Sequence, residues 1–422
     1  MSISLLNWIE RNYRLLLMIS LFSLLLAGGF YSIHLGNNLR FQDERDFYAI
    51  AKNLAEGKGY SIDGINPTAY RAPGYPLFLA IFAKLGAGVF FCRMLNFLFL
   101  AGTMVLIFII GNRESGRLAG VISSLLILLY PVLFFTASTL YAQTLGTFLL
   151  ISTILLLNYT DVKTKSKAVL LGAISGFLQG WLMLTIPGFI PTFFVISVWF
   201  LIARRELFLS RRIITLLVMF IIAFLLFFLW TVRNYRTFHK FILLTTNEGI
   251  TLLHGNSEFA TPNSGASTDI GQYLPGAEGL SEVEQNDYFR SQAIQWILNN
   301  KGRAVKLYFL KVLNWFNYRN QLAQKSEASR FRDFVMLITY LPLLLLFLIR
   351  LFLARRFRLV QVEWLLLILY VINAFTYAVF HTRIRYRLPF DVGMIAVVAV
   401  FISNLIQLFK ERFGNRLKVG GI

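Results

Sequence analysis

Long apolar runs separated by short polar loops dominate this chain. A hydrocarbon layer of roughly 30 Å needs about 20 apolar residues in each helix that crosses it. Ten runs meet that length or nearly so: Leu15–Leu35, Met94–Ile110, Leu118–Ala137, Leu140–Leu157, Ala168–Thr185, Pro187–Ala203, Ile213–Val232, Phe334–Leu353, Trp364–Phe380 and Leu388–Phe409. The pattern predicts an all-α polytopic membrane protein with about ten transmembrane helices.

The short loops between these runs predict which way the chain lies in the membrane. Five polar segments are rich in Lys or Arg: Gly111–Arg117, Asp161–Lys167, Arg204–Arg212, Arg355–Arg358 and Lys410–Lys418. The positive-inside rule puts all five in the cytoplasm. These assignments agree only if the apolar stretch Tyr75–Phe91, which carries Lys84, does not cross. We expect a half-depth helix there, because the stretch is too short to span comfortably at about 1.5 Å per residue.

Both termini then lie inside, and the run that follows Arg11 and Arg14 is interpreted as a retained anchor. We expect three parts. Residues 1–232 form a transmembrane module whose outer first loop, residues 36–92, contains juxtamembrane helices. Residues 233–332 form a second outer loop, with an amphipathic pattern over Glu282–Lys311 that predicts membrane-surface helices. Residues 333–422 supply the last transmembrane helices.

Composition supports this class and excludes others. Hydrophobic residues make up 57% of the 422 residues and the mean hydropathy is +0.63, which does not describe a soluble globular domain. The single cysteine, Cys92, and the absence of CxxC or HExxH spacing exclude a disulfide framework, a thiolate zinc site and a zincin motif.

The net charge of +20 is larger than the cytoplasmic loops explain. Many basic residues fall in segments predicted outside: Lys301, Arg303, Lys306, Lys311, Arg319, Lys325, Arg330, Arg332, Arg383, Arg385 and Arg387. An anionic ligand at the outer face would account for them. A phosphate-bearing lipid fits better than nucleic acid, because the charges are dispersed beside helix ends and Arg forks match phosphate oxygens.

An acidic cluster, Phe41-Gln-Asp-Glu-Arg-Asp-Phe-Tyr48, lies just beyond the first apolar run. Carboxylates beside a low-dielectric boundary can have their pKa raised into a range useful for acid–base catalysis. The alternative is that Asp43, Glu44 and Asp46 are solvated charges next to the membrane. Residue type and position leave these two interpretations about equal.

Three separated motifs resemble those of the membrane-embedded GT-C glycosyltransferases that use polyprenyl-phosphate sugars. The first runs from Asp43-Glu44 through Gly57-Lys-Gly-Tyr60 to Pro67-Thr-Ala-Tyr-Arg-Ala-Pro-Gly-Tyr-Pro76. It is similar to the first outer loop of the bacterial branch related to protein O-mannosyltransferases and aminoarabinose transferases. The others are Trp230–Tyr235, continuing to Thr246-Asn-Glu-Gly249 and Gly255-Asn256, and Arg385-Tyr-Arg-Leu-Pro389. Two positions depart from that branch. Its fourth helix often begins with a Glu, where this chain has Gln143, and its fifth helix often ends in an Arg-Pro pair, where this chain has Ile186-Pro187.

The resemblance implies roles for individual residues. Asp43 would be the catalytic base, and Glu44 would position the acceptor or pair with an Arg. Contacts to substrate are expected from Asp46, Tyr48, Tyr70, Arg71, Arg233, Arg383, Arg385 and Arg387. The alternative for the arginines is that they anchor helix ends at the membrane interface. The alternative for the tyrosines is that they belong to the aromatic belt at that interface. His254 and His381 are both predicted outside, so a divalent metal is conceivable, but we predict no metal and no other cofactor.

The function that the resemblance implies is transfer of a sugar from a polyprenyl-phosphate donor to a hydroxyl of an envelope glycolipid, polysaccharide or protein. The reaction is expected at the outer side of a bacterial cytoplasmic membrane, with inversion at the anomeric carbon and without nucleic acid as a partner. Two alternatives remain open: a lipid or sugar transporter, and an inactive scaffold of an envelope-polysaccharide pathway. No motif encodes the sugar, the acceptor or the oligomeric state.

Overall fold

A computed structural model describes residues 3–319 and 329–419, so Lys325 and the rest of residues 320–328 lie outside the described part of the second loop. The described residues form helices and connecting segments without strands. The helices are α1 (Ile3–Arg11), α2 (Tyr13–Leu35), α3 (Gln42–Ala55), α4 (Gly74–Ala83), α5 (Val89–Leu128), α6 (Pro131–Ala137), α7 (Ala142–Tyr159), α8 (Lys165–Thr185), α9 (Ile190–Ala203), α10 (Leu209–Phe238), α11 (Glu248–Gly255), α12 (Glu282–Asn299), α13 (Lys301–Asn314), α14 (Arg330–Phe352), α15 (Gln361–Val379) and α16 (Ile384–Val419).

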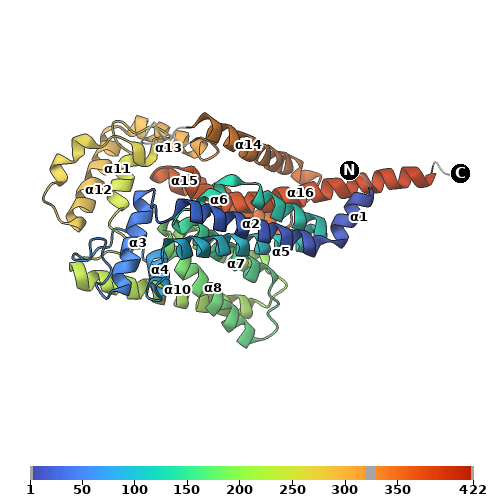
Figure 1. The fold of residues 1–422 in the computed structure, drawn as a ribbon, viewed down its shortest axis with the longest axis horizontal. Coiled ribbons are helices and arrows are strands. Elements are labelled where there is room, and N and C mark those ends of the chain that lie inside the picture. Colours follow the sequence, from blue (N-terminus) through green and yellow to red (C-terminus); the bar gives the residue numbers. More distant parts are fainter. Residues whose placement is uncertain (1–2, 320–328, 420–422) are drawn as a thin grey trace.

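Most of the long helices run along the long axis of an elongated bundle (Figure 1). Helices α3, α4, α11 and α12 gather at one end, which we call the loop end. Helix α1 and the last turns of α16 lie at the opposite end, so the first and last described helices share one end of the bundle (Figure 1). The two long polar segments predicted to share a side of the membrane do lie at one end of the molecule.

Helix α5 is two membrane-crossing limbs rather than one continuous helix. Its backbone leaves helical geometry at Ser115 and Gly116, where Gly116 has φ 79°. A Cβ on Gly120 would lie 2.9 Å from the ring of Phe108. Residues twelve apart are about 18 Å apart in a straight helix, so the chain must reverse between them. The predicted Gly111–Arg117 loop is therefore this reversal, made within a few residues.

Eight helices in the described ranges are long and apolar enough to cross a membrane. Counting the limbs of α5 separately and adding the shorter apolar helix Pro187–Ala203 brings the number to ten. The predicted all-α, multi-pass fold with about ten spans is confirmed.

Several predicted boundaries were wrong. The short helix at the loop end covers only Gly74–Ala83, because Gly86 takes φ 82° and Val89–Phe91 already belong to α5. The apolar run Leu118–Ala137 is not one helix, because α5 ends at Leu128 and α6 begins at Pro131. The segment predicted as membrane-surface helices over Glu282–Lys311 forms two helices, α12 and α13, which meet at Asn300, whose ψ is 44°.

Helices α8 and α10 pack along each other through a row of glycines. Cβ atoms built on Gly172 and Gly176 would lie 2.5 and 2.6 Å from the carbonyl oxygens of Thr215 and Met219. Small residues four apart allow two backbones to approach, which replaces the hydrophobic effect as the source of helix association in lipid. This row fixes α10, whose far end contacts the first loop.

Replacing Gly176 with Leu should destabilise the protein by about 3 kcal/mol, because the side chain has no space against the α10 backbone. The expected result is a clearly lower midpoint of thermal unfolding in detergent. Gly29→Leu in α2 is the matched control, since nothing lies within 4 Å of a Cβ built there. Equal midpoints for both variants would contradict this packing.

Candidate active site

Helix α3 presents two carboxylates on its buried face. Asp43 and Asp46 are three residues apart and share that face with Phe47 and Ile50, which pack into apolar clusters. The side chain of Asp46 is 5% exposed and that of Asp43 is 20% exposed. The apolar residues of the helix therefore anchor it so that both acids point into the protein.

Arg71 pairs with both acids. Its Nε and Nη2 donate to Asp46 Oδ2 at 2.9 and 2.6 Å, and Nη2 lies 2.8 Å from Asp43 Oδ1. Asp46 Oδ1 accepts a further bond from Gln42 at 2.7 Å. The guanidinium also lies over the ring of Tyr70, at 5.0 Å. Asp46 thus holds Arg71 in place, and Arg71 still reaches Asp43.

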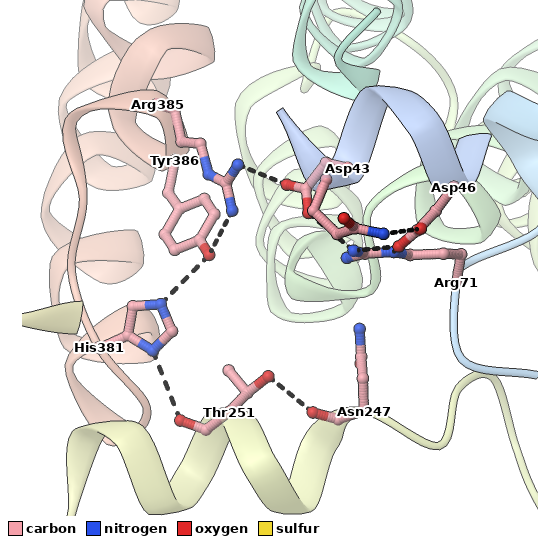
Figure 2. A network of polar contacts seen from close by, with 9 residues as sticks. Asp43, Asp46, Arg71, Asn247, Thr251, His381, Arg385 and Tyr386 are labelled. Atoms are coloured by element: carbon pink, nitrogen blue, oxygen red, sulfur yellow. Dashed lines mark hydrogen bonds and ion pairs between the residues drawn. The ribbon is translucent and has the colours of Figure 1, made fainter. Parts of the chain in front are cut away.

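Arg385 reaches the same carboxylate from the start of α16, near the other end of the sequence. Its Nη1 donates to Asp43 Oδ2 at 2.5 Å, and Nη2 donates to the Tyr386 hydroxyl at 3.3 Å. Each oxygen of Asp43 is therefore paired with a different arginine. Figure 2 shows Asp43 between Arg71 and Arg385.

A chain of polar contacts continues from Arg385 into α11. His381 Nε2 lies 3.2 Å from the Tyr386 hydroxyl, and Nδ1 lies 3.4 Å from the carbonyl oxygen of Thr251. Thr251 in turn donates to the carbonyl of Asn247 at 2.6 Å. In Figure 2 the side chain of Asn247 extends toward Arg71.

Burial acts to raise the pKa of Asp43, but the charges of Arg385 and Arg71 outweigh it, and the pKa lies below its ordinary value. The expectation of a raised pKa was wrong, because the sequence does not reveal that two arginines converge on one carboxylate. Asp43 is ionised at neutral pH and can accept a proton, although both its oxygens are already engaged.

Arg383 lies beside this cluster and has a hydrogen-bond donor without an acceptor. Its Nη2 donates to Ser267 Oγ at 2.8 Å, while its buried Nε has no partner. The Nε of Arg385 is likewise buried and unpartnered. The three arginines and two aspartates sum to one positive charge, and unpaired buried donors cost free energy. The site is therefore suited to a ligand with one negative charge and several acceptor oxygens.

Two histidines lie next to these arginines. The ring centroids of His254 and His381 are 6.5 Å apart. Burial lowers the pKa of His254 to about 4, and burial with the neighbouring Arg383 lowers the pKa of His381 as well. Both are neutral at physiological pH. No group of three or more His, Cys, Asp or Glu side chains that could hold a metal occurs in the ranges 4–319 and 329–410, where side chains are described.

Glu44 lies outside the cluster. Its Oε2 accepts from the backbone N–H groups of Arg40 and Phe41 at 2.8 and 3.2 Å, and Oε1 accepts from Leu140 N at 2.9 Å. The side chain is fully buried. It caps the start of α3 and ties that start to the segment between α6 and α7, so it orients Asp43 through the helix.

The two predicted tyrosines lie in different places. Tyr70 stacks on Arg71 in the cluster. Tyr48 is about 140° around α3 from Asp43, at 100° per residue, and packs against the main apolar core. The structure therefore brings only Tyr70 to the paired acids.

Arg233 and Arg387 have other partners. Arg233 donates to the carbonyls of Thr68 and Tyr60 at 2.8 and 3.2 Å and so holds the first loop. Arg387 is almost fully buried, pairs with Asp391 at 2.9 Å and donates to the carbonyl of Trp315 at 2.5 Å. Neither contacts the Asp43 carboxylate.

Sequence reasoning missed Glu282 and Tyr141. Glu282, the first residue of α12, accepts from Thr68 Oγ1, Ala69 N and Thr246 Oγ1 at 2.5–2.8 Å and so joins the two loops just before Arg71. Tyr141 lies 5.1 Å from the Arg385 guanidinium, and burial raises its pKa to about 12. A single sequence carries no local signal for either contact.

The two departures noted in the sequence lie near this region. Gln143 is buried in α7, two residues after Tyr141, and lines a small cavity with Leu388 and four threonines: Thr103, Thr136, Thr144 and Thr147. Ile186 directly follows the last residue of α8 and lies next to Gly146. Neither side chain touches Asp43, so the departures leave the paired acids and arginines unchanged.

An apolar groove of about 670 Å³ lies along α9 and the half of α10 nearer the loop end. It is lined mainly by aromatic residues: Phe193, Phe194, Phe220, Phe224, Phe227, Phe228 and Phe241. Thr231, Tyr235 and Arg236 close its polar end. Arg233, one turn from Arg236, holds Thr68 in the loop that carries Arg71.

No protein-family model matches the chain, and no curated protein is significantly similar to it. Among solved structures, it is similar to ArnT from Cupriavidus metallidurans bound to undecaprenyl phosphate, with a TM-score of 0.45 and 13% identity. The apo state of the same protein gives a TM-score of 0.43 and 14% identity. Each match covers 91% of this chain and 77% of the other. A likeness this remote assigns the chain neither to a family nor to a function.

Proposed function

We propose that this protein is a membrane glycosyltransferase that moves a sugar from a polyprenyl-phosphate donor to a hydroxyl group. The observation that carries the proposal is Asp43, an ionised carboxylate at the end of a membrane-spanning bundle, paired through separate oxygens with Arg71 and Arg385. A base beside two phosphate-binding forks is the pairing that this transfer needs. The first and third of the motifs that resemble the GT-C glycosyltransferases contain these same residues.

The donor is a phosphodiester with one negative charge, which matches the single excess positive charge of the cluster. Its phosphate oxygens would take up the unpartnered Nε–H groups of Arg383 and Arg385 and compete with Asp43 for the two arginines. Donor binding would therefore release a lone pair of Asp43 for the acceptor. Asp46 would keep Arg71 in place during this exchange.

Asp43 then takes the proton of the acceptor hydroxyl while the acceptor oxygen attacks the anomeric carbon. The bond between that carbon and the phosphate oxygen breaks, and polyprenyl phosphate leaves with the electron pair, stabilised by the arginines. A single direct displacement inverts the anomeric configuration. The residues of this chain supply a base and cationic support, and no step requires a metal.

The donor's prenyl chain has room in the groove along α9 and α10. Val232→Trp, at the polar end of the groove, should raise KM for a long-chain donor by about tenfold while leaving a short-chain donor little affected, because one bulky ring excludes several methylenes. Leu229→Trp on the lipid-exposed face of α10 is the control. Equal effects on both donor lengths would remove the groove from donor binding.

We place the reaction at the outer side of a bacterial cytoplasmic membrane, because basic loops mark the opposite end as cytoplasmic. A glycolipid or envelope polysaccharide is the proposed acceptor class, with a protein acceptor as the second choice.

The test uses purified protein in phospholipid vesicles, undecaprenyl-phosphate sugars as donors and a lipid extract of the host envelope as acceptor. A new glycosidic bond of inverted configuration supports the proposal. Sugar-lipid movement across the vesicle membrane without bond formation would favour a transporter. If the protein neither forms a glycosidic bond nor moves the sugar lipid with any donor mixture, a scaffold role is favoured.

A further inference from the structure

Lys311 in α13 is a fully buried ammonium group at the loop end that forms no ion pair among the described residues. Its Nζ donates to the carbonyl oxygens of Gly255 and Phe380 at 2.9 and 2.8 Å and to Asn256 Oδ1 at 3.2 Å. An ammonium group has three donors, and here each has one acceptor. A buried charge without a carboxylate partner is costly, so this arrangement needs an explanation.

Two of the three acceptors are the ends of helices. Gly255 is the last residue of α11, and Phe380 follows the last residue of α15. Carbonyl groups at a helix C-terminus lack intrahelical partners and carry the negative end of the helix dipole, which favours a nearby cation. Lys311 therefore satisfies two helix ends at once, and their dipoles replace a carboxylate.

The ends of α11 and α15 meet without space for another group. A Cβ on Gly255 would lie only 1.6 Å from the carbonyl oxygen of Phe380. Asn256 also donates to the carbonyl of Val379 at 2.9 Å. The carbonyl groups of Gly255 and Phe380 both accept from the Lys311 ammonium, which therefore links the two helix ends. The junction depends on this cation for its geometry.

The same junction leads directly into the site. Thr382 Oγ1 donates to the carbonyl of Lys311 at 3.2 Å and accepts from Asn314 Nδ2 at 2.9 Å. Residues 380–382 are thus held by α13 on two sides. Arg383 and Arg385 follow at once, and Arg385 pairs with Asp43.

We propose that Lys311 is a positioning residue: its ammonium fixes the turn from Phe380 to Arg385 and so sets the arginines against Asp43. The consequence for transfer rests on the proposed function, whereas the consequence for the turn does not. Lys311 is not proposed to contact the substrate, because it acts through the backbone of the turn.

The charge of Lys311 changes near neutral pH, because burial lowers its pKa to about 7. The titratable groups nearest the junction are His254 of α11 and His381 and Arg383 of the turn, and both histidines are already neutral at this pH. Above pH 7 the neutral amine loses one donor, and one acceptor loses its partner. Between about pH 7 and the ordinary value of 10.5 the unfolded chain binds more protons than the folded chain, so Lys311's contribution to the free energy of unfolding rises with pH. The same linkage applies to local opening of the turn that exposes Lys311 to water, so this opening becomes less frequent as the pH rises above 7.

Hydrogen–deuterium exchange of the full-length protein in lipid nanodiscs tests this directly. Lys311→Met should speed exchange of the backbone amides in residues 378–386 by at least about tenfold at pH 6.5, with rates corrected for intrinsic exchange. Lys306→Met, an exposed lysine of the same helix, is the matched control and should change nothing. In the wild type, the same amides should exchange more slowly at pH 8.5 than at pH 6.5 after correction for intrinsic exchange, while those of α8 should not change.

Unchanged protection of residues 378–386 in Lys311→Met, or an equal effect of Lys306→Met, would overturn the proposal. If Lys311→Met fails to fold, the wild-type pH series decides, and corrected rates that are identical at both pH values, or faster at pH 8.5, would overturn the proposal. If the protein transfers sugar, Lys311→Met should lower kcat more than it raises KM. If the wild type transfers sugar but exchange in the turn is normal in Lys311→Met, the positioning role fails and the proposed function stands. If exchange in the turn is altered in Lys311→Met but the wild type transfers no sugar, the positioning role stands and the proposed function fails.

Discussion

Replacing Asp43 with Asn is expected to lower kcat for sugar transfer about 10³-fold, with a much smaller change in KM. The amide keeps the size of the side chain and can still lie between Arg71 and Arg385, but it cannot accept the acceptor's proton. General bases contribute typically about 10²–10⁴-fold. The measurement is initial-rate kinetics in vesicles with a single undecaprenyl-phosphate sugar.

The control for this variant is Glu278→Gln, which removes an exposed carboxylate in the second loop. It should transfer at the wild-type rate. Wild-type kcat in Asp43→Asn would exclude Asp43 as the base, even if the protein is a transferase. A fall in folded yield without a fall in kcat would limit Asp43 to stabilising the loop end.

Replacing Arg385 with Lys should lower kcat about 10²-fold, because an ammonium retains the charge but not the fork that can hold Asp43 and a phosphate oxygen together. Arg385→Ala should cost about tenfold more. The pH dependence gives a second readout. Arg385 holds the pKa of Asp43 below its ordinary value, so removing the guanidinium should move the acid limb of the rate profile to higher pH.

Arg45→Lys is the matched control for Arg385→Lys. Arg45 is exposed on α3, two residues from Asp43, and its side chain donates to the carbonyl of Leu39 at 3.2 Å. It should leave both the rate and the acid limb unchanged. An acid limb that stays in place in Arg385→Ala would mean that Arg385 does not govern the ionisation of Asp43.

Hydropathy predicts the fold well because lipid imposes a length on every span, independent of its neighbours. It fails where a single residue's backbone decides the outcome. Gly86 takes a positive φ and ends α4 earlier than apolarity predicts, although the reversal at Ser115 and Gly116 falls in the loop that was predicted between two runs. Periodicity over Glu282–Lys311 likewise does not reveal the bend at Asn300.

The site was harder to predict, since it joins residues far apart in the chain. The acidic cluster and the arginines of α16 stand out by type, and 342 positions separate Asp43 from Arg385. Which arginine meets which acid depends on helix rotation. Arg385 faces Asp43, but Arg387, two residues further along α16, pairs with Asp391 in the core. Glu44 was expected beside Asp43 in the chemistry, yet adjacent helix positions point about 100° apart.

The most direct test of the central claim is mass spectrometry of envelope glycolipids and glycans from the host strain lacking this protein. The strain is compared after rescue with the wild-type chain, Asp43→Asn or Glu278→Gln. A transferase that uses Asp43 predicts loss of one defined sugar in the deletion strain, restored by the wild type and Glu278→Gln but not by Asp43→Asn. Full restoration by Asp43→Asn, or an unchanged set of sugars in the deletion strain, would contradict it.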